Sequence, residues 1–384
     1  MESNLKQTKK HEPLFKVFKR GDMPKWKALI IRFSATLGAI IFSMILAGII
    51  IGRSPFAIFG TMVRGAFSLP WRLLYDGIIL LGFGVAIVPA FKMKFWNMGA
   101  NGQVLVGCLA AVLIMFYYGD GMNNFILILL MFICSLLASI IWAVVPALFK
   151  AFFKTNETLF TLMMNYIAIG LVAYCNFAMA KGKKETPGIV NDLTEKGWVN
   201  FNFLPPTVKS YILPIIVIII ITFLIYVYIN KTKHGFEVNV LGDSENTARY
   251  AGMNTKWITI RTLMISGIIC GIIGFLFASC VHHCVTVNLC GGKGFSGVLI
   301  AWLSNFNPLI MAGVSLFMAF IDNGTSSVTA TYSLGSNALS SVIIGLIFFA
   351  ILISKFFIRY RVVRRDRHQE NKHNDSIIEE AKQC

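Results

Sequence analysis

The segment Cys280-Val-His-His-Cys284, followed by Cys290, carries the side chains best suited to chemistry. Thiolates and imidazoles are the usual zinc ligands, but this spacing matches no standard zinc pattern. Local packing at the end of an apolar run is the preferred interpretation, and we predict no metal site. The sequence also lacks H-E-x-x-H, G-x-S-x-G and G-x-x-x-x-G-K-[ST] segments, which disfavours a hydrolase and argues against P-loop binding of ATP. We expect no catalytic residue and no cofactor in this chain.

A cluster of amides opens one of the apolar runs. Asn97, Asn101 and Gln103 are interleaved with Gly99 and Gly102. Glycines three apart lie near one helix face and allow close helix approach. Amides in an apolar zone are costly unless they bond across helices or face water. The cluster therefore predicts either helix packing or part of a solute path, and spacing alone does not separate the two.

A second polar stripe begins the run that starts near residue 158. Asn156 is a good N-cap, and Glu157 suits the first turn of a helix. Thr158, Thr161 and Asn165 then recur at spacings of three and four residues, which places them on one helix face. The stripe predicts inter-helix hydrogen bonds, the commoner outcome, or a contribution to a path.

The segment 242–252 predicts a short helix outside the apolar runs. Asp243 or Ser244 can cap it, Glu245 fits its first turn, and Gly252 fits a left-handed position after its end. About two turns are then held between stops at Gly242 and Gly252. Such a helix is either solvated or docks a partner.

Residues 291–297 contain four glycines and lead into a short apolar run, 294–304, through Gly294, Phe295 and Gly297. Irregular backbone at membrane depth is tolerated only when protein buries it or when it lines a watery cavity. Interrupted apolar segments are therefore the best pointer to a path. The spacing of Gly294 and Gly297 repeats that of Gly99 and Gly102, which suggests an inverted repeat.

Few ionisable residues interrupt the apolar runs. Arg72 and Asp76 are four residues apart and are interpreted as a pair at the rim of a span. A proton-coupled carrier would need an acid or a histidine at mid-depth. Asp76 is the one real candidate, because Asp322 is expected at the end of a span.

The elements that must position these residues are membrane helices. The 384-residue chain is 56% hydrophobic and 14% charged, whereas soluble proteins average about 25% charged residues. We expect an all-α polytopic membrane protein with about ten spans, since runs of about 20 apolar residues read as spans. The predicted spans are 33–52, 73–91, 98–118, 125–149, 158–180, 211–229, 259–282, 294–304, 308–322 and 337–358.

Charge gives the orientation. The net charge is +17, and 26 of the 35 Lys and Arg residues fall on one side when the N-terminus is placed in the cytoplasm. The charge therefore indicates topology and contact with lipid, and no nucleic-acid partner is expected. We predict a cytosolic basic arm over 1–31, which does not resemble a cleavable signal peptide. A membrane domain over 32–360, with an outer loop at 181–209, and a cytosolic tail over 361–384 follow.

Four segments in order resemble a known group of permeases. They are Asn97-Met-Gly-Ala-Asn-Gly-Gln103, Asn156-Glu157…Thr161-Leu-Met-Met-Asn165-Tyr166, Gly242…Ala248-Arg-Tyr-Ala-Gly252 and Gly294-Phe-Ser-Gly297…Asn307-Pro308. The chain resembles permease subunits of bacterial ABC importers in the branched-chain amino acid / simple sugar permease superfamily, over about residues 30 to 360. The nucleoside-type permeases that work with Bmp-like lipoproteins are the closest group.

The resemblance implies a type II ABC importer fold, with two permease subunits around a central path. The second subunit would be a paralogue or a copy. It also implies a separate ATPase that binds ATP and Mg, and a substrate-binding lipoprotein on the extracellular or periplasmic side. The expected ATPase-coupling residues are Gly242, Asp243, Ser244, Ala248, Arg249, Tyr250, Ala251 and Gly252. The candidate path residues are Asn97, Asn101, Gln103, Thr161, Asn165, Gly294, Phe295 and Gly297.

The expected solutes are nucleosides or related ribosides, carried across the bacterial cell (inner) membrane with both termini in the cytoplasm. Simple sugars, riboflavin and branched-chain amino acids are alternatives, and an ion-coupled secondary carrier is the alternative from another class. Three positions depart from the family pattern. Asn101 stands where an acid is expected, Ser244 where Asn is common, and Thr247 where Ala is common.

Overall fold

The computed structural model describes residues 15–19, 24–180, 188–199, 205–333 and 338–364, which form two compact units. The first unit comprises 1–59 with 338–384, and the second comprises 60–337. Parts of the predicted basic arm, outer loop and tail lie outside the described residues, at 1–14, 20–23, 181–187, 200–204 and 365–384.

The first unit is built around two packed helices, α1 (Lys25–Ile51) and α14 (Ala338–Arg359). α1 ends at Gly52, whose φ of +71° closes the helix in the left-handed conformation that glycine adopts readily. The strand β1 (Phe15–Lys19) precedes α1, and β2 (Tyr360–Arg364) follows α14 directly. These strands pair antiparallel, with Phe15 opposite Arg364. This short ribbon lies outside the membrane helices and was not expected from the sequence.

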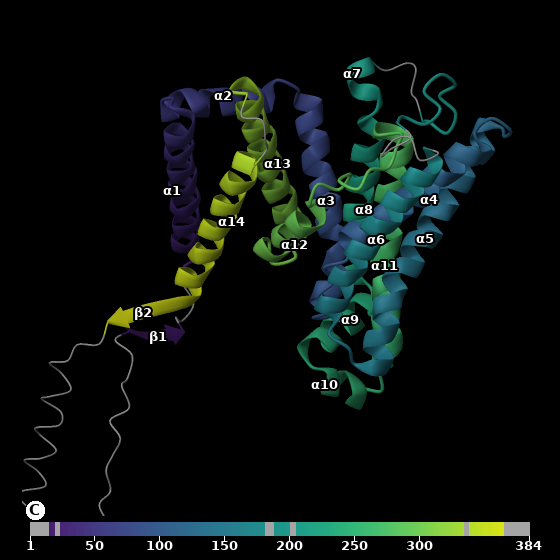
Figure 1. The fold of residues 1–384 in the computed structure, drawn as a ribbon. Coiled ribbons are helices and arrows are strands. Elements are labelled where there is room, and N and C mark those ends of the chain that lie inside the picture. The colour runs from purple at the N-terminus through teal and green to yellow at the C-terminus, as the bar shows by residue number, and fades with distance from the viewer. Residues whose placement is uncertain (1–14, 20–23, 181–187, 200–204, 334–337, 365–384) are drawn as a thin grey trace, which may run out of the picture. The chain divides into compact units, whose positions relative to one another are not determined.

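The helix α2 (Pro55–Phe67) leads into the second unit. That unit contains α3 (Pro70–Lys92), α4 (Ala100–Tyr118), α5 (Asn124–Phe153), α6 (Glu157–Met179), α7 (Pro206–Lys209), α8 (Ile212–Lys231), α9 (Lys233–Asp243), α10 (Glu245–Tyr250), α11 (Thr255–Leu276), the π-helix η1 (Phe277–Val281), α12 (Lys293–Leu303) and α13 (Pro308–Thr331). Within it, α7 and α10 lie at opposite ends of the helix group (Figure 1).

Nine of the described helices are long and apolar enough to cross a membrane. They correspond to the nine long predicted runs, so the all-α polytopic expectation is confirmed. α12 has 11 residues, which gives a length of about 16 Å, roughly half the thickness of a bilayer core. The predicted short run is therefore a half-length helix. α2 and α9 were not predicted.

Small residues hold the centre of the second unit together. A Cβ on Gly274 of α11 would lie 2.7 Å from the backbone nitrogen of Cys108 in α4, and one on Gly271 would lie 2.9 Å from the Cα of Leu136 in α5. Backbones approach closely at such positions, which is the common solution for helix packing in membranes. α3 also lies inside this unit and contacts α8, α11, α12 and α13.

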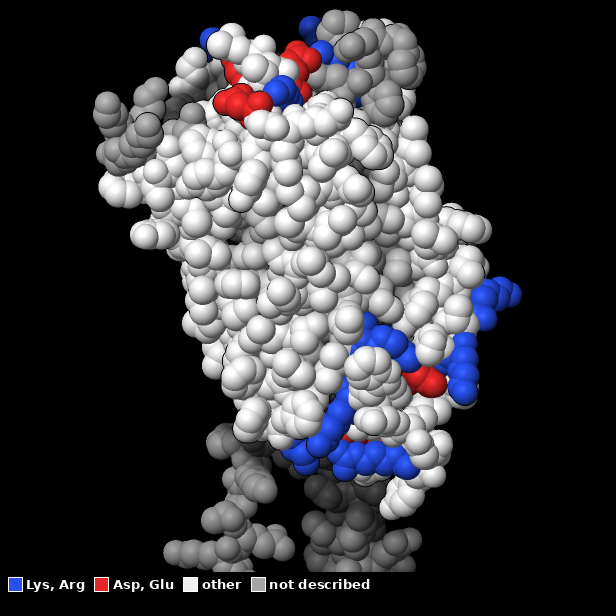
Figure 2. Space-filling model, turned by 90° about the vertical axis from the view of Figure 1, so that its right-hand side faces the viewer, with Lys and Arg blue, Asp and Glu red and all other residues white. Residues whose placement is uncertain are grey.

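One face of the molecule is a continuous apolar surface. Figure 2 shows a white band between charged groups gathered toward the two ends. Exposed side chains on α5, α6 and α8 include Phe125, Ile133, Tyr174, Ile220 and Phe223. Large exposed apolar side chains on long helices are suited to contact with lipid tails.

Candidate functional site

The predicted amide cluster lies where α4, α6 and α11 meet. Asn97 is fully buried; its Nδ2 donates to Ser266 Oγ of α11 at 3.1 Å, and its Oδ1 accepts from the Gly99 amide at 3.0 Å. Gln103 Nε2 donates to the same Asn97 oxygen at 3.4 Å, while Gln103 Oε1 is buried without a hydrogen-bond partner. The cluster therefore joins α11 to the irregular segment that precedes α4.

The stripe on α6 binds the same segment. Asn165 Oδ1 accepts from the Gly102 amide at 2.8 Å, and its Nδ2 donates to the Met98 carbonyl at 2.8 Å. Thr161 Oγ1 accepts from the Met98 amide at 3.1 Å. Asn156 caps α6 as predicted, because its side chain accepts from Leu159 N. The stripe thus makes inter-helix bonds, the commoner of the two predicted outcomes.

Asn101 joins the start of α4 to the start of α12. Its Oδ1 accepts from the Gly294 amide at 2.7 Å, and a Cβ on Gly294 would lie 2.5 Å from that oxygen. The N-cap of α12 is Gly292, which has no side chain to satisfy the first amides of the helix. Asn101 therefore caps α12 from α4, a role that a carboxylate at this position would also perform. The two glycine patterns noted in the sequence meet at this contact.

Most of the candidate path residues are enclosed by protein. Gly297 packs on α3, where its added Cβ would lie 2.9 Å from Phe83 Cβ. Phe295 is the exception, with 44% of its surface exposed. Seven of the eight residues predicted for the path are buried: Asn97, Asn101, Gln103, Thr161, Asn165, Gly294 and Gly297. Their hydrogen bonds run mainly to backbone and side chains of neighbouring elements, so they form a frame around the start of α4 and of the half-length helix α12.

A polar face on α13, next to the predicted pair Arg72 and Asp76 of α3, was not singled out from the sequence. Asp76 Oδ2 accepts from Asn323 Nδ2 at 3.2 Å and lies 3.8 Å from Arg72 Nε. The prediction that Asp322 ends a span is wrong, because α13 continues for nine more residues to Thr331. Loss of hydropathy after residue 322 was interpreted as the end of the helix, whereas it marks one polar face.

That face had a detectable signal. Ser326 and Ser327 lie three and four residues after Asn323, and Ala330 lies four and three residues after them, which places all four on one side of a helix. All four line a cavity of about 250 Å³, which Gly65, Ala66, Ser68, Leu69 and Arg72 complete.

The short helix predicted within 242–252 is present as α10. Ser244 caps it by accepting from Thr247 N, Glu245 in the first turn pairs with Arg249, and Gly252 follows with φ +74°. The helix covers Glu245–Tyr250, within the predicted 242–252. The predicted stop at Gly242 is wrong, since Gly242 lies buried inside α9.

Gly242 is instead a packing contact between α9 and the end of α3. A Cβ at this position would lie 1.9 Å from the Lys92 carbonyl oxygen. Lys94 Nζ also donates to the Asp243 carbonyl at 3.4 Å. The α9–α10 hairpin is therefore seated directly on the end of α3.

The residues of α10 divide by exposure. Ala248 is fully buried and contributes to seating the helix within the chain, whereas Tyr250 is 93% exposed. Asp243, Arg249, Ala251 and Gly252 are also exposed. The exposed side of α10 is thus available to a partner.

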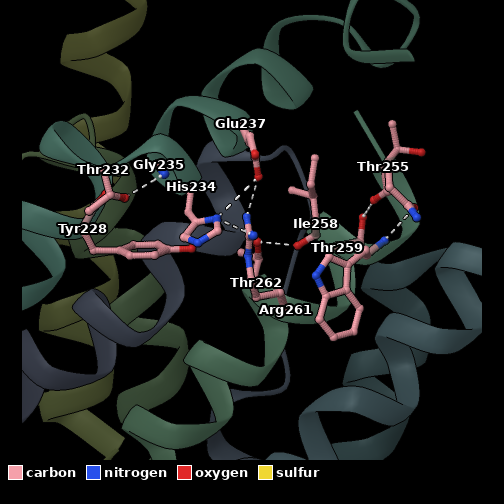
Figure 3. A network of polar contacts seen from close by, with 12 residues as sticks. Tyr228, Thr232, His234, Gly235, Glu237, Thr255, Ile258, Thr259, Arg261 and Thr262 are labelled. Atoms are coloured by element: carbon pink, nitrogen blue, oxygen red, sulfur yellow. Dashed lines mark hydrogen bonds and ion pairs between the residues drawn. The ribbon is translucent and has the colours of Figure 1, made fainter. Parts of the chain in front are cut away.

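A polar network fixes α9 to α11 (Figure 3). Arg261 of α11 donates from Nη2 to Glu237 Oε2 at 2.9 Å, and its Nη1 contacts His234 Nδ1. Thr232 caps α9 by accepting from the Gly235 amide at 3.1 Å. The hydrogen bond from Arg261 lowers the pKa of Glu237, so the carboxyl remains ionised and the pair remains intact at neutral pH.

The cysteine and histidine segment makes packing contacts. His283 stacks on Trp198 with ring centroids 3.7 Å apart, and Cys290 Sγ lies 3.7 Å from the Asn101 carbonyl. Within the described ranges, no group of three or more His, Cys, Asp or Glu side chains is arranged to hold a metal ion.

Comparison with known proteins identifies the architecture. Residues 69–352 match the family described as the permease component of the branched-chain amino acid transport system. The chain belongs to this permease family. It is therefore a multi-pass transport subunit of the ABC class, and the resemblance inferred from the four motifs is confirmed.

Relatives within the family carry different solutes. A guanosine ABC transporter permease of Bacillus subtilis is 25% identical over 82% of this chain and 93% of its own length. A glucose ABC transporter permease of Haloferax volcanii is 26% identical over 76% of this chain and 78% of its own. A nucleoside ABC transporter permease of Lactococcus lactis is 23% identical over 76% of this chain and 83% of its own.

Proposed function

We propose that this permease subunit carries nucleosides or related ribosides across a bacterial cell membrane, driven by a separate ATPase. Relatives named for guanosine and for nucleosides support this solute class. A simple sugar is the second candidate, because another relative is named for glucose. Both solutes are polar and uncharged, and both carry several hydroxyl groups.

The ATPase is proposed to dock on α10 and the aromatic side chains around it. Tyr250 is 93%, Phe236 61% and Trp257 54% exposed, and all three belong to α9, α10 or the start of α11. Aromatic side chains exposed outside the apolar spans are suited to a protein interface. ATP and Mg would be bound by that ATPase and not by this chain.

Movement of α10 would reach the solute path through α3. The α9–α10 hairpin is seated on Lys92 at one end of α3, and Arg72 and Asp76 lie near the other end of the same helix. This helix of 23 residues is about 35 Å long and joins the two places directly. A second permease, a paralogue or a copy, would complete the path, and a lipoprotein would deliver the solute from outside.

The test is reconstitution. The chain would be co-purified with its partner ATPase, second permease and lipoprotein and placed in proteoliposomes. We expect uptake of radiolabelled guanosine that requires ATP, the lipoprotein and an intact ATP site in the partner. Glucose would be measured in parallel. Uptake by this chain alone under a proton or sodium gradient would instead establish an ion-coupled carrier.

Tyr250→Ala separates docking from folding. Because Tyr250 is exposed and projects from a short helix, its loss should leave membrane insertion and thermal stability unchanged while it weakens capture of the ATPase. We expect a loss of about tenfold or more in affinity, since buried aromatic anchors commonly contribute about 2 kcal/mol or more. Tyr117→Ala removes an exposed tyrosine from the last turn of α4, far from α10, and is the matched control. Equal ATPase capture by both variants would exclude α10 as the dock.

A further inference from the structure

The polar face of α3 and α13 places charge inside a membrane span. Asp322 lies 14 residues after the start of α13 and nine before its end, or about 21 Å and 14 Å along the helix. Asp322 is exposed in the structure, and the side chain of Arg72 is 59% exposed. Charged groups at membrane depth are costly in lipid, so such groups face water or another protein.

Opposite charges gather at this face. Asp76 contacts Arg72 and accepts a hydrogen bond from Asn323. Asp322 comes directly before Asn323 on α13 and is exposed. Arg72 and Asp76 form an ion pair and together carry no net charge.

A cavity adjoins these charges. Its volume is about 250 Å³, and Arg72, Asn323, Ser326 and Ser327 supply its polar wall. This volume is near the lower end of the range for small-molecule sites, about 300 Å³. The face contrasts with the exposed apolar surface of α5, α6 and α8.

We propose that the cavity between α2, α3 and α13, together with Arg72, Asp76 and Asn323, is the binding site for a neutral, hydroxyl-rich solute on the wall of the transport path. The proposal rests on the proposed function and places its solute away from the buried amide frame. Carboxylate and amide oxygens accept hydrogen bonds from solute hydroxyls, while the amide and the serines donate and accept. An anion would meet the Asp76 carboxylate and a cation the Arg72 guanidinium, so the paired charges favour an uncharged solute.

Uptake kinetics test the site in the complete reconstituted importer. Ser327→Ala and Asn323→Ala should each raise the KM for guanosine about tenfold, the usual effect of losing a hydrogen bond to the solute. Asp120→Asn, which neutralises an acid in a loop outside the cluster, is the matched control and should transport normally. If both site variants keep the wild-type KM, the proposed site is wrong. If the wild-type importer carries neither guanosine nor glucose, the proposed function fails independently.

Water access gives a second measurement that does not depend on turnover. Ser326→Cys would be treated with the membrane-impermeant reagent MTSET, and modification of its peptide followed by mass spectrometry. Ile220→Cys on the exposed apolar face of α8 is the control. We expect faster modification at 326 than at 220, and slower modification at 326 when guanosine, or glucose if that is carried, is added. Equal rates at the two positions would exclude a watery path here, and a rate that solute leaves unchanged would exclude the binding site.

Discussion

Gly242→Ala is the most direct perturbation of the link between α10 and α3. The new Cβ would lie 1.9 Å from the Lys92 carbonyl oxygen, although real Cβ contacts shorter than 3.0 Å essentially do not occur. α9 must therefore move away from α3 by about 1.1 Å or more, because a backbone oxygen has no rotamer with which to escape. Overpacking of this kind costs about 1 to 3 kcal/mol.

Two readouts distinguish a loosened link from a misfolded chain. In proteoliposomes we expect ATP hydrolysis to continue while solute uptake per ATP falls at least about fivefold, the lower range of coupling energies between sites. Thermal unfolding in detergent reports the packing cost separately. Gly170→Ala is the matched control, since a Cβ on Gly170 of α6 meets nothing within 4 Å. Wild-type uptake per ATP in Gly242→Ala would refute the link between α10 and α3.

Two further predictions concern the frame and the network. Asn101→Ala should destabilise the protein by about 1 to 3 kcal/mol, because the buried Gly294 amide loses its acceptor, whereas Asn101→Asp should retain most of the stability; equal unfolding temperatures for Asn101→Ala and the parent would contradict the cross-helix cap. Glu237→Gln should lower stability at pH 7, where the ionised carboxylate binds Arg261. Because the folded pKa of Glu237 is lowered, this stabilisation is complete above its ordinary value of 4.5 and disappears as the pH falls through the folded pKa. The difference between parent and variant in thermal unfolding should therefore shrink under acid conditions, and a constant difference would argue against the ion pair.

Short-range sequence signals predicted part of the candidate site. Ser244, Glu245 and Gly252 predicted α10 because caps and left-handed glycines act through neighbouring residues. From the sequence, Asn97, Asn101 and Asn165 could serve either helix packing or a solute path. Their partners decide in favour of packing, and those partners are distant in sequence: Asn101 meets Gly294 across 193 residues.

Other features depended on surroundings that the sequence does not display. Glycine is typical of a helix end, yet Gly242 lies inside α9, where it packs against the backbone of Lys92. Asp322 follows an apolar run and therefore looks like its end. The helix α13 nevertheless continues, because the polar residues that follow lie on one side of it, next to Arg72 and Asp76 of α3. Hydropathy averages over all faces of a helix, so a helix with one polar side looks like a shorter apolar one.

The sequence by itself determined the class of protein, its membrane helices and its short helix at Glu245–Tyr250. Those properties follow from the length of apolar runs and from capping residues within one turn. Tertiary structure alone decided which polar residues bond to each other and which line a cavity. Hydrogen bonds between helices form between residues far apart in the chain, and only folding shows which donors and acceptors they use.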